Sequence, residues 1–205
     1  MAKAKESLDV LQRDDDEIIR AVCAGDTEAF AELVEKYQAM AIRVAFSLLG
    51  NEQDANDVAQ EAFISAYQAL PRFRGGAKFS TWLYRIIANK CKDVYRKRSR
   101  TADSWLRISS ADSGSNEDYI MEIQDPQPEP VLKQFSREVA EALNEAVSQL
   151  PLKQRMAFVL HHLHGMAFNE VAEVMQCRVG TVKSHVFRAT KTLKVSMQPW
   201  LQEVS

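Results

Sequence analysis

The sequence predicts an all-α protein of two small helical domains joined by a flexible linker. Glycine and proline are scarce, with 7 and 6 copies in 205 residues, whereas folds of many strands need both in their turns. Apolar side chains recur at helical spacing on both sides of a polar segment, and residues 14–100 lack the alternation typical of strands. A chain that is 46% hydrophobic and 26% charged has the composition of an ordinary globular protein with one or two modest cores.

Three helices are expected between residues 14 and 70. Gly25-Asp26-Thr27 and Gly50-Asn51 separate them, because such residues favour turns. The second helix carries an apolar stripe at i, i+3, i+4 and i+7 spacing that would bury one face: Phe30, Leu33, Val34, Tyr37, Ala41, Val44, Ala45 and Leu48. Asn51 is placed to cap the third helix. The stripe of that helix consists of Val58, Ala62, Phe63, Ala66 and Leu70.

A loop and a fourth helix are expected after Pro71. The loop, residues 72–79, combines two glycines with two aromatic side chains and three cations, and Ser80 is expected to cap the helix. The apolar stripe of the helix consists of Trp82, Leu83, Ile86, Ile87, Cys91 and Val94. The other side presents Arg85, Asn89, Lys92 and Arg96 at i, i+4, i+7 and i+11. One face therefore packs, and the other is a basic ridge.

The predicted organisation is an N-terminal tail (1–13), a first domain (14–100), an acidic linker (101–134) and a second domain (135–205). The linker holds three prolines and seven acids against two cations, which favours little fixed structure. A helical stripe begins the second domain: Val139, Leu143, Ala146, Val147 and Leu150. Pro151 suits the first turn of the next helix, which is expected to end near His162.

Residues 167–189 have helix-turn-helix spacing. Two short helices are joined by a tight turn, with the small Ala172 at their crossing and Val182 on the inner face of the second. Thr181 is expected to cap that second helix. Its outer face would present cations and hydrogen-bonding side chains to a major groove: Arg178, Lys183, Ser184, His185, Arg188 and Lys191. The alternative is a helical hairpin that only packs.

The net charge of −2 conceals a division along the chain. Residues 1–62 carry six Lys or Arg against fourteen Asp or Glu, whereas residues 71–100 carry ten basic side chains against Asp93 alone. Residues 178–194 add five more cations without an acid. Two separate basic blocks therefore lie in a mildly acidic chain, as expected either for nucleic-acid contact or for solvated helix faces.

The sequence gives little support for a metal site, a disulfide bond or a membrane span. Cys23, Cys91 and Cys177 are odd in number and far apart, so we expect buried thiols and neither disulfides nor a zinc site. The histidines at 161, 162 and 164 lack ligand spacing and suit the end of a helix. We therefore expect no catalytic residues, metal or cofactor. The sequence has no apolar run long enough to span a membrane and no leader pattern. We therefore expect a cytoplasmic location and no direct membrane insertion.

Two sets of motifs carry a family resemblance. GTVKSHVFRA following an EVAEVM helix resembles region 4 of the extracytoplasmic-function (ECF) sigma factors, small sigma-70-type subunits of bacterial RNA polymerase that recognise promoters. NEQDANDVAQEAFISAYQALPRF, followed by FSTWLYRIIANKCKDVYRKRSR, resembles region 2 of the same family in order and spacing. The matching segments cover residues 14–100 and 135–197, and their co-occurrence makes the resemblance specific.

The resemblance implies three groups of functional residues. Binding of the −35 element would use Arg178, Thr181, Lys183, Ser184, His185, Arg188 and Lys191. Binding and melting of the −10 element, including capture of a flipped non-template base, would use Arg72, Phe73, Arg74, Lys78, Phe79, Tyr84, Arg85, Asn89, Lys92 and Arg96. Binding of core polymerase would use Asp54, Asp57, Gln60 and Glu61.

The implied partners are core RNA polymerase, promoter DNA and an anti-sigma factor. Polymerase contacts would involve the clamp helices of the largest subunit and the flap of the second-largest subunit. Promoter contacts would involve duplex DNA and the non-template single strand. The acidic linker would either thread the polymerase cleft or serve only as a solvated tether. The chain would lend promoter specificity without catalysis of its own.

Some residues admit another interpretation or depart from the family pattern. Phe79 and Trp82 suit a core as well as a DNA site, and the acidic face of the third helix suits solvent as well as polymerase. Ala167 stands where a capping Ser or Thr is usual, and Gln176 stands where the turn usually has Gly. The rival function is a dimeric helix-turn-helix response regulator, which would need a βα receiver domain that residues 14–100 do not indicate.

Overall fold

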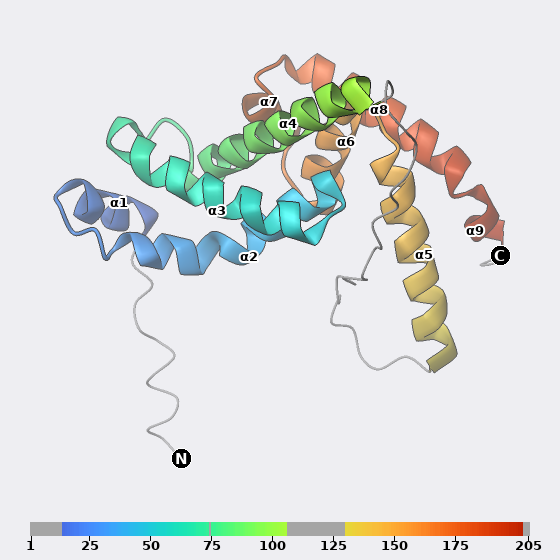
Figure 1. Cartoon of the computed structure of the whole chain (residues 1–205), viewed down its shortest axis with the longest axis horizontal. Helices are drawn as coiled ribbons and strands as arrows, with labels where there is room; N and C mark the ends of the chain where they lie inside the picture. The colour runs from blue at the N-terminus through green and yellow to red at the C-terminus, as the bar shows by residue number, and fades with distance from the viewer. Residues whose placement is uncertain (1–13, 74, 106–129, 203–205) are drawn as a thin grey trace.

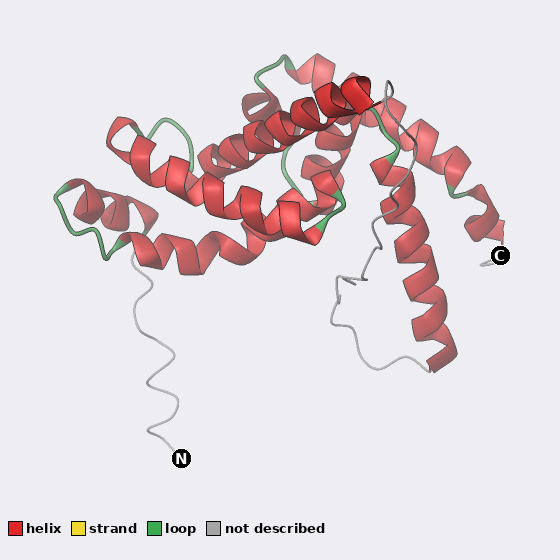
Figure 2. Cartoon of the chain, viewed as in Figure 1, coloured by secondary structure: helices red, strands yellow, loops and turns green. Residues whose placement is uncertain are grey.

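The computed structural model describes residues 14–73, 75–105 and 130–202, and every regular element in these ranges is helical (Figure 2). The elements, in chain order, are α1 Asp15–Cys23, α2 Phe30–Leu49, α3 Glu52–Ala69, the 3-10 turn η1 Leu70–Arg72, α4 Phe79–Trp105, α5 Pro130–Ser148, α6 Leu152–Phe158, the π-helical turn η2 Val159–Leu163, α7 Phe168–Met175, α8 Val179–Ser196 and α9 Gln198–Gln202. The all-α prediction is confirmed.

The N-terminal helices, α1–α4, form a bundle in which α2, α3 and α4 pack on one another and α1 packs on α2 (Figure 1). The predicted stripes supply its core: Leu33, Val44, Leu48, Ala62, Ala66, Leu83, Ile87 and Cys91 are fully buried. Gly50 ends α2 in the left-handed conformation, with φ +68°. The side chain of Asn51 then accepts a hydrogen bond from the backbone N–H of Asp54 at 2.9 Å. The predicted cap of α3 is therefore confirmed.

The C-terminal helices, α5–α9, contain the helix-turn-helix pair, α7 and α8, packed on α6. Val182 is fully buried and Ala172 is 7% exposed, as their predicted inner positions require. Pro151 lies at the N-cap of α6 and not in its first turn. Beyond Phe158 the helix continues as η2, so the segment ends one residue past His162.

Three further expectations about local structure are wrong. Helix α4 continues to Trp105 and α5 begins at Pro130, so both ends of the predicted linker are helical, while residues 106–129 lie outside the described residues. Ser80 and Thr181 lie inside α4 and α8, which begin at Phe79 and Val179, so neither caps its helix. Local propensity identified a good capping residue near each start, but the chain enters each helix earlier.

The three cysteines differ in exposure. Cys91 is buried, and burial raises the pKa of its thiol to about 12. Cys177 is half-buried, whereas Cys23 is exposed, which corrects the expectation that all three would be buried. Cys23 is the last residue of α1, whose buried residues are Ile18 and Ile19. In the described part of the chain, no helix combines the length and apolar character that a membrane span requires.

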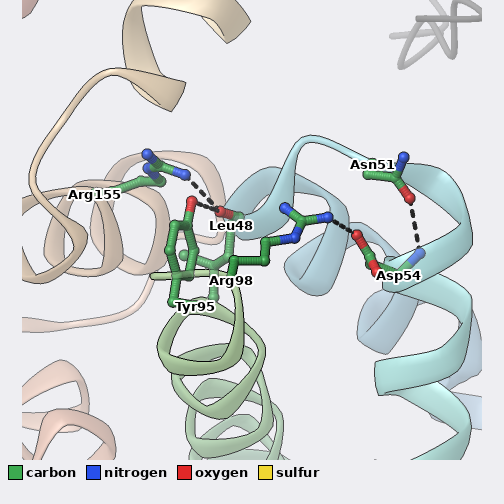
Figure 3. Close-up of polar contacts among 6 residues, drawn as sticks. All are labelled: Leu48, Asn51, Asp54, Tyr95, Arg98 and Arg155. Atoms are coloured by element: carbon green, nitrogen blue, oxygen red, sulfur yellow. Dashed lines mark hydrogen bonds and ion pairs between the residues drawn. The ribbon is translucent and has the colours of Figure 1, made fainter. Parts of the chain in front are cut away.

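The two sets of helices pack against each other, chiefly through α4 with α7 and through α2 with η2 and α5 (Figure 1). The carbonyl of Leu48, in the last turn of α2, has no intrahelical donor. Tyr95 of α4 donates its hydroxyl to this oxygen at 3.0 Å, and Arg155 of α6 donates Nη1 at 2.8 Å (Figure 3). Arg155 also donates Nη2 to the carbonyls of Ser148 and Leu150. One guanidinium, 5% exposed, thus joins the ends of α2 and α5.

Candidate nucleic-acid and polymerase interfaces

The predicted −35 residues lie on one helix and are almost all open to solvent. Arg178 is the N-cap residue of α8, and the others follow within the helix. Six of the seven are exposed: Arg178, Thr181, Lys183, Ser184, Arg188 and Lys191. His185 is half-buried, and its Nδ1 has no hydrogen-bond partner in the described structure. The exposed face of α8 is therefore cationic and carries hydroxyl groups, as a helix that enters a major groove requires.

Local contacts orient two of these side chains. The hydroxyl of Ser184 donates to the carbonyl of Gly180 at 2.9 Å, one turn back. The ammonium of Lys183 lies 5.7 Å from the ring centroid of Phe168, so a cation–π contact directs it towards the start of α7. Thr181 has no capping role and remains an exposed side chain of the first turn.

Phe187 was not among the predicted site residues. It is 71% exposed on α8, directly before Arg188, and a large apolar side chain is an unusual occupant of such a position. An exposed aromatic ring on a recognition helix is suited to contact the methyl group of a thymine. The signal was present in the sequence, because Phe187 falls outside the apolar spacing that buries Val182 and Val186.

The aromatic side chains after α3 form a cluster in which only part of the predicted set is accessible. Phe79 is 2% exposed and contacts Tyr37 and Trp82 at centroid distances of 5.4 and 5.7 Å, so its assignment to DNA binding is wrong. Its position as the first residue of α4 directs the ring into the bundle. Phe73 lies at the edge of the cluster, 4.9 Å from Trp82, and remains partly exposed. Arg72 and Lys78 are exposed beside it, and Arg74 lies outside the described residues.

Tyr84 is covered by the C-terminal helices. Its ring meets that of His164 edge-on at 5.9 Å, and burial raises the pKa of its hydroxyl. His164 follows η2, and burial together with Arg43 lowers the pKa of its imidazole to about 4. In this arrangement Tyr84 is not free to stack on a base. The periodicity of α4 could not reveal this contact, because it joins helices 80 residues apart in sequence.

The predicted basic ridge of α4 is partly enclosed. Arg85 and Asn89 are exposed, and Asn89 accepts a hydrogen bond from the ammonium of Lys92 at 3.2 Å. Lys92 and Arg96 lie beside His185 around a cavity of about 410 Å³, named here the junction cavity. Its lining comprises Lys92, Arg96, Pro151, Leu152, Lys153, Gln154, Met156 and His185. Side chains predicted for the −10 and −35 surfaces therefore meet at one place.

The predicted polymerase face lies on α3. Asp57, Gln60 and Glu61 are exposed and Asp54 is half-buried. Arg98 of α4 pairs with Asp54 (Figure 3), and Lys90 pairs with Glu61 at 3.3 Å. The same side of α3 continues into exposed apolar side chains that sequence reasoning missed: Ile64 (54%) and Tyr67 (40%). Acidic groups followed by apolar ones form a surface suited to a basic partner with a hydrophobic patch.

The described residues hold no cluster of three or more potential metal ligands. The geometry instead defines a class of protein: a helical chain with a cationic recognition helix, a second cationic helix beside an aromatic cluster, and an acidic face on a third helix. Surfaces of this kind are typical of proteins that bind nucleic acid and a protein partner.

Comparison with known proteins agrees with this class. Residues 33–101 match the family described as Sigma-70 region 2, and residues 140–193 match Sigma-70, region 4. The RNA polymerase sigma-H factor of Pseudomonas aeruginosa is 36% identical over 193 residues, which covers 94% of this chain and 98% of that protein. The ECF RNA polymerase sigma-E factor of Escherichia coli is 34% identical over 192 residues, covering 93% and 98%.

Solved structures share the fold. CnrH in complex with the cytosolic domain of CnrY matches with a TM-score of 0.62 and 24% identity, over 90% of this chain and 97% of that one. The sigma factor RpoE in complex with the anti-sigma factor NepR, from Bartonella quintana, matches with a TM-score of 0.63 and 23% identity, over 82% and 96%. The present chain belongs to the ECF group of the sigma-70 family, with α2–α4 in region 2 and α6–α8 in region 4.

Proposed function

We propose that this protein is a sigma subunit that binds core RNA polymerase, recognises the −35 and −10 promoter elements and promotes DNA melting. The observation that carries the proposal is the presence, in one chain and in family order, of region 2 and region 4, each with a cationic helical surface. The chain contributes binding and positioning and no catalysis of its own. Its domains are the region 2 helices, within 14–100, and the region 4 helices, within 135–205, and its place of action is the cytoplasm.

The proposed −35 contact uses the outer face of α8. Arg188, Lys183 and Ser184 are the leading base-contacting residues, and Phe187 adds an apolar contact. Arginine matches guanine in the major groove through two hydrogen bonds, whereas Arg178 and Lys191 at the two ends of the face are better placed for phosphates. His185 is the weakest of the predicted set, because it is half-buried beside the junction cavity.

The proposed −10 contact uses the loop before α4 and the basic side of that helix. Phe73 is the stacking residue, since Phe79 belongs to the core and Tyr84 is covered. Arg72, Lys78, Arg85 and Asn89 are the accessible polar groups near it. Stacking of about 1 to 3 kcal/mol for a base offsets part of the cost of extracting that base from the duplex.

The proposed polymerase contact is the exposed face of α3, with the clamp helices of the largest subunit as its partner and region 4 on the flap of the second-largest. Asp57 and Gln60 are unobstructed, whereas Asp54 and Glu61 would exchange Arg98 and Lys90 for basic groups of the polymerase. Ile64 and Tyr67 extend the contact with apolar area. An anti-sigma factor is the proposed inhibitor, supported by family membership and by the complexes in which two structures of this fold were solved.

Transcription with purified core polymerase tests the function. The chain is expected to direct synthesis from defined promoters that core enzyme alone ignores. Asp57→Arg should weaken binding to core polymerase by about fivefold or more, because it reverses a charge at the contact. Glu17→Arg is the matched control, as Glu17 is exposed on α1, outside both matched regions. Failure to bind core polymerase, or binding without promoter-dependent transcripts, would refute the proposal.

A further inference from the structure

The histidines at 161, 162 and 164 have no part in the proposed function, but His161 contacts the helix-turn-helix. It lies in η2, the π-helical turn that ends at Leu163, and Gly165 then turns the chain with a φ of +67°. The ring of His161 meets the ring of Phe168, the first residue of α7. An aromatic pair therefore forms where the helix-turn-helix begins.

Two kinds of contact hold this aromatic pair in place. The rings of His161 and Phe168 are stacked, with centroids 4.0 Å apart and an interplanar angle of 26°. Nδ1 of His161 donates a hydrogen bond to the carbonyl of Met166 at 2.8 Å, because a carbonyl oxygen can only accept. Both side chains are half-buried. The ring of Phe168 is thus supported by a neighbour that is itself tied to the backbone.

The ammonium of Lys183 lies beside the same ring, 5.7 Å from the centroid of Phe168. Lys183 is exposed on α8 and is one of the residues proposed to contact bases. Lysine carries its charge on a long flexible stem, so an ammonium without a partner samples many positions. A cation–π contact with a fixed ring restricts those positions. Phe168 therefore determines where the charge of Lys183 lies before α8 meets DNA.

The strength of this contact suits orientation better than sequestration. A cation–π contact at an exposed site corresponds to about two- to fivefold in an equilibrium constant. Such a contact biases the direction of the ammonium, and a hydrogen bond to a base can replace it at little cost. Packing alone accounts for the stacked rings, but it does not require a cation of the recognition helix beside them.

We propose that Phe168, stacked on His161, is a positioning residue for −35 recognition, and that its ring directs the ammonium of Lys183 towards its contact with DNA. The inference rests on the proposed function, because it requires α8 to recognise the −35 element. A residue of the first helix of the pair, acting through Lys183, then sets part of the discrimination made by the second. Holding the ammonium in advance lowers the cost of ordering it on binding.

Promoter binding by holoenzyme tests the proposal, measured as the ratio of affinities for templates with and without the −35 element. Phe168→Leu should lower this ratio by about two- to fivefold, because the ammonium is no longer held. Phe168→Tyr keeps an aromatic face and should retain the ratio. In a Lys183→Ala background, Phe168→Leu should have no further effect, since the side chain that it orients is absent. Circular dichroism and thermal unfolding check that each variant folds.

Arg188 provides the matched control pair. It is exposed on α8 more than one turn beyond Lys183, so Phe168→Leu and Arg188→Ala should lower the ratio independently. Independent effects of Phe168→Leu and Lys183→Ala, or equal losses in Phe168→Leu and Phe168→Tyr, would overturn the proposal. A higher ratio in Phe168→Leu would also overturn it, because the ring would then hold the ammonium away from DNA. Failure of the proposed function is seen separately, as the absence of promoter binding by holoenzyme with the unsubstituted chain.

Discussion

Phe73 and Phe79 lie in one aromatic cluster, with centroids 6.2 Å apart, but only Phe73 retains exposure. Phe79→Ala should lower the free energy of unfolding by about 3 to 5 kcal/mol, because it opens a cavity in the bundle. Phe73→Ala should have a smaller effect on stability and should weaken promoter opening by about 1 to 3 kcal/mol through the lost stacking. Urea denaturation and open-complex formation, measured on both variants, separate the two roles. Comparable opening defects at equal folded fractions would contradict the assignment.

Arg188 tests the recognition helix at the same scale. Its exposed position on α8 means that Arg188→Ala should weaken use of the −35 element by about 1 to 3 kcal/mol while leaving stability nearly unchanged. Promoter binding by holoenzyme, compared on templates with and without the −35 element, provides the measurement. Lys194→Ala serves as the charge-matched control near the end of α8. A defect that persists on the template without the element would assign Arg188 to phosphates and not to bases.

Helix α7 begins without half of its usual cap. Glu170 accepts a hydrogen bond from the backbone N–H of Ala167 at 2.9 Å, but the methyl side chain of Ala167 cannot accept the reciprocal bond from the backbone N–H of Glu170. Ala167→Ser should therefore stabilise the protein by about 1 kcal/mol, which thermal unfolding would detect as a higher Tm. Gln176→Gly should also relieve strain, because Gln176 adopts a φ of +54° at the end of α7. No gain from either change would mean that tertiary packing already fixes these termini.

Helices and their buried faces follow from local sequence, and this explains which predictions succeeded. The stripes of α2, α3 and α4 repeat over several turns, so the spacing of apolar residues alone identified the face of each helix that forms the core. The exact first residue of each helix was harder to predict, as Ser80 and Thr181 show. A capping side chain acts only at the position directly before the helix begins. The spacing of apolar residues also could not decide whether Phe79 is buried. Phe79 stands where the loop meets the helix, and it suited the core as well as a DNA site.

Contacts between the two sets of helices could not be predicted. The carbonyl of Leu48 binds Tyr95 and Arg155, and Arg155 is 107 residues away in sequence. No periodicity relates these positions. The same holds for His164 against Tyr84 and for His185 beside Lys92. Most cations of the two predicted basic surfaces are exposed, but the partial enclosure of these surfaces depends on how the whole molecule packs.

Arg155 is the residue on which that packing most depends. Arg155→Met should lower the free energy of unfolding by roughly 2 to 4 kcal/mol, because the carbonyls of Ser148 and Leu150 lose their donor and Leu48 retains only Tyr95. The guanidinium also lies 5.1 Å from the ring of Tyr95, so Tyr95→Phe should show coupling to it of about 0.5 kcal/mol or more in a double-mutant cycle. Additive effects in urea denaturation would place the two side chains in separate interactions.

His164 makes the packing of the whole molecule sensitive to acid. Its imidazole contacts the ring of Tyr84 of α4, and the charge of Arg43 of α2 acts on it. Glu170 of α7 acts on the same Tyr84, and Nε2 of His164 has no hydrogen-bond partner among the described residues. The pKa of His164 is about 4 when packed, against an ordinary value of 6.5. The neutral ring is therefore the form that packs, and its stabilising contribution is complete above pH 6.5 and is lost as the pH falls towards 4.

Between those limits each pH unit should weaken the packing by at most about 1.4 kcal/mol. Energy transfer between fluorophores attached to α3 and α8 should accordingly fall on acidification from pH 7 to pH 4.5, while circular dichroism shows that the helices persist. His164→Gln should remove most of this pH dependence, whereas His162→Gln, an exposed neighbour, should preserve it. An unchanged acid response in His164→Gln would shift the cause to the carboxylates, whose protonation acts in the same pH range.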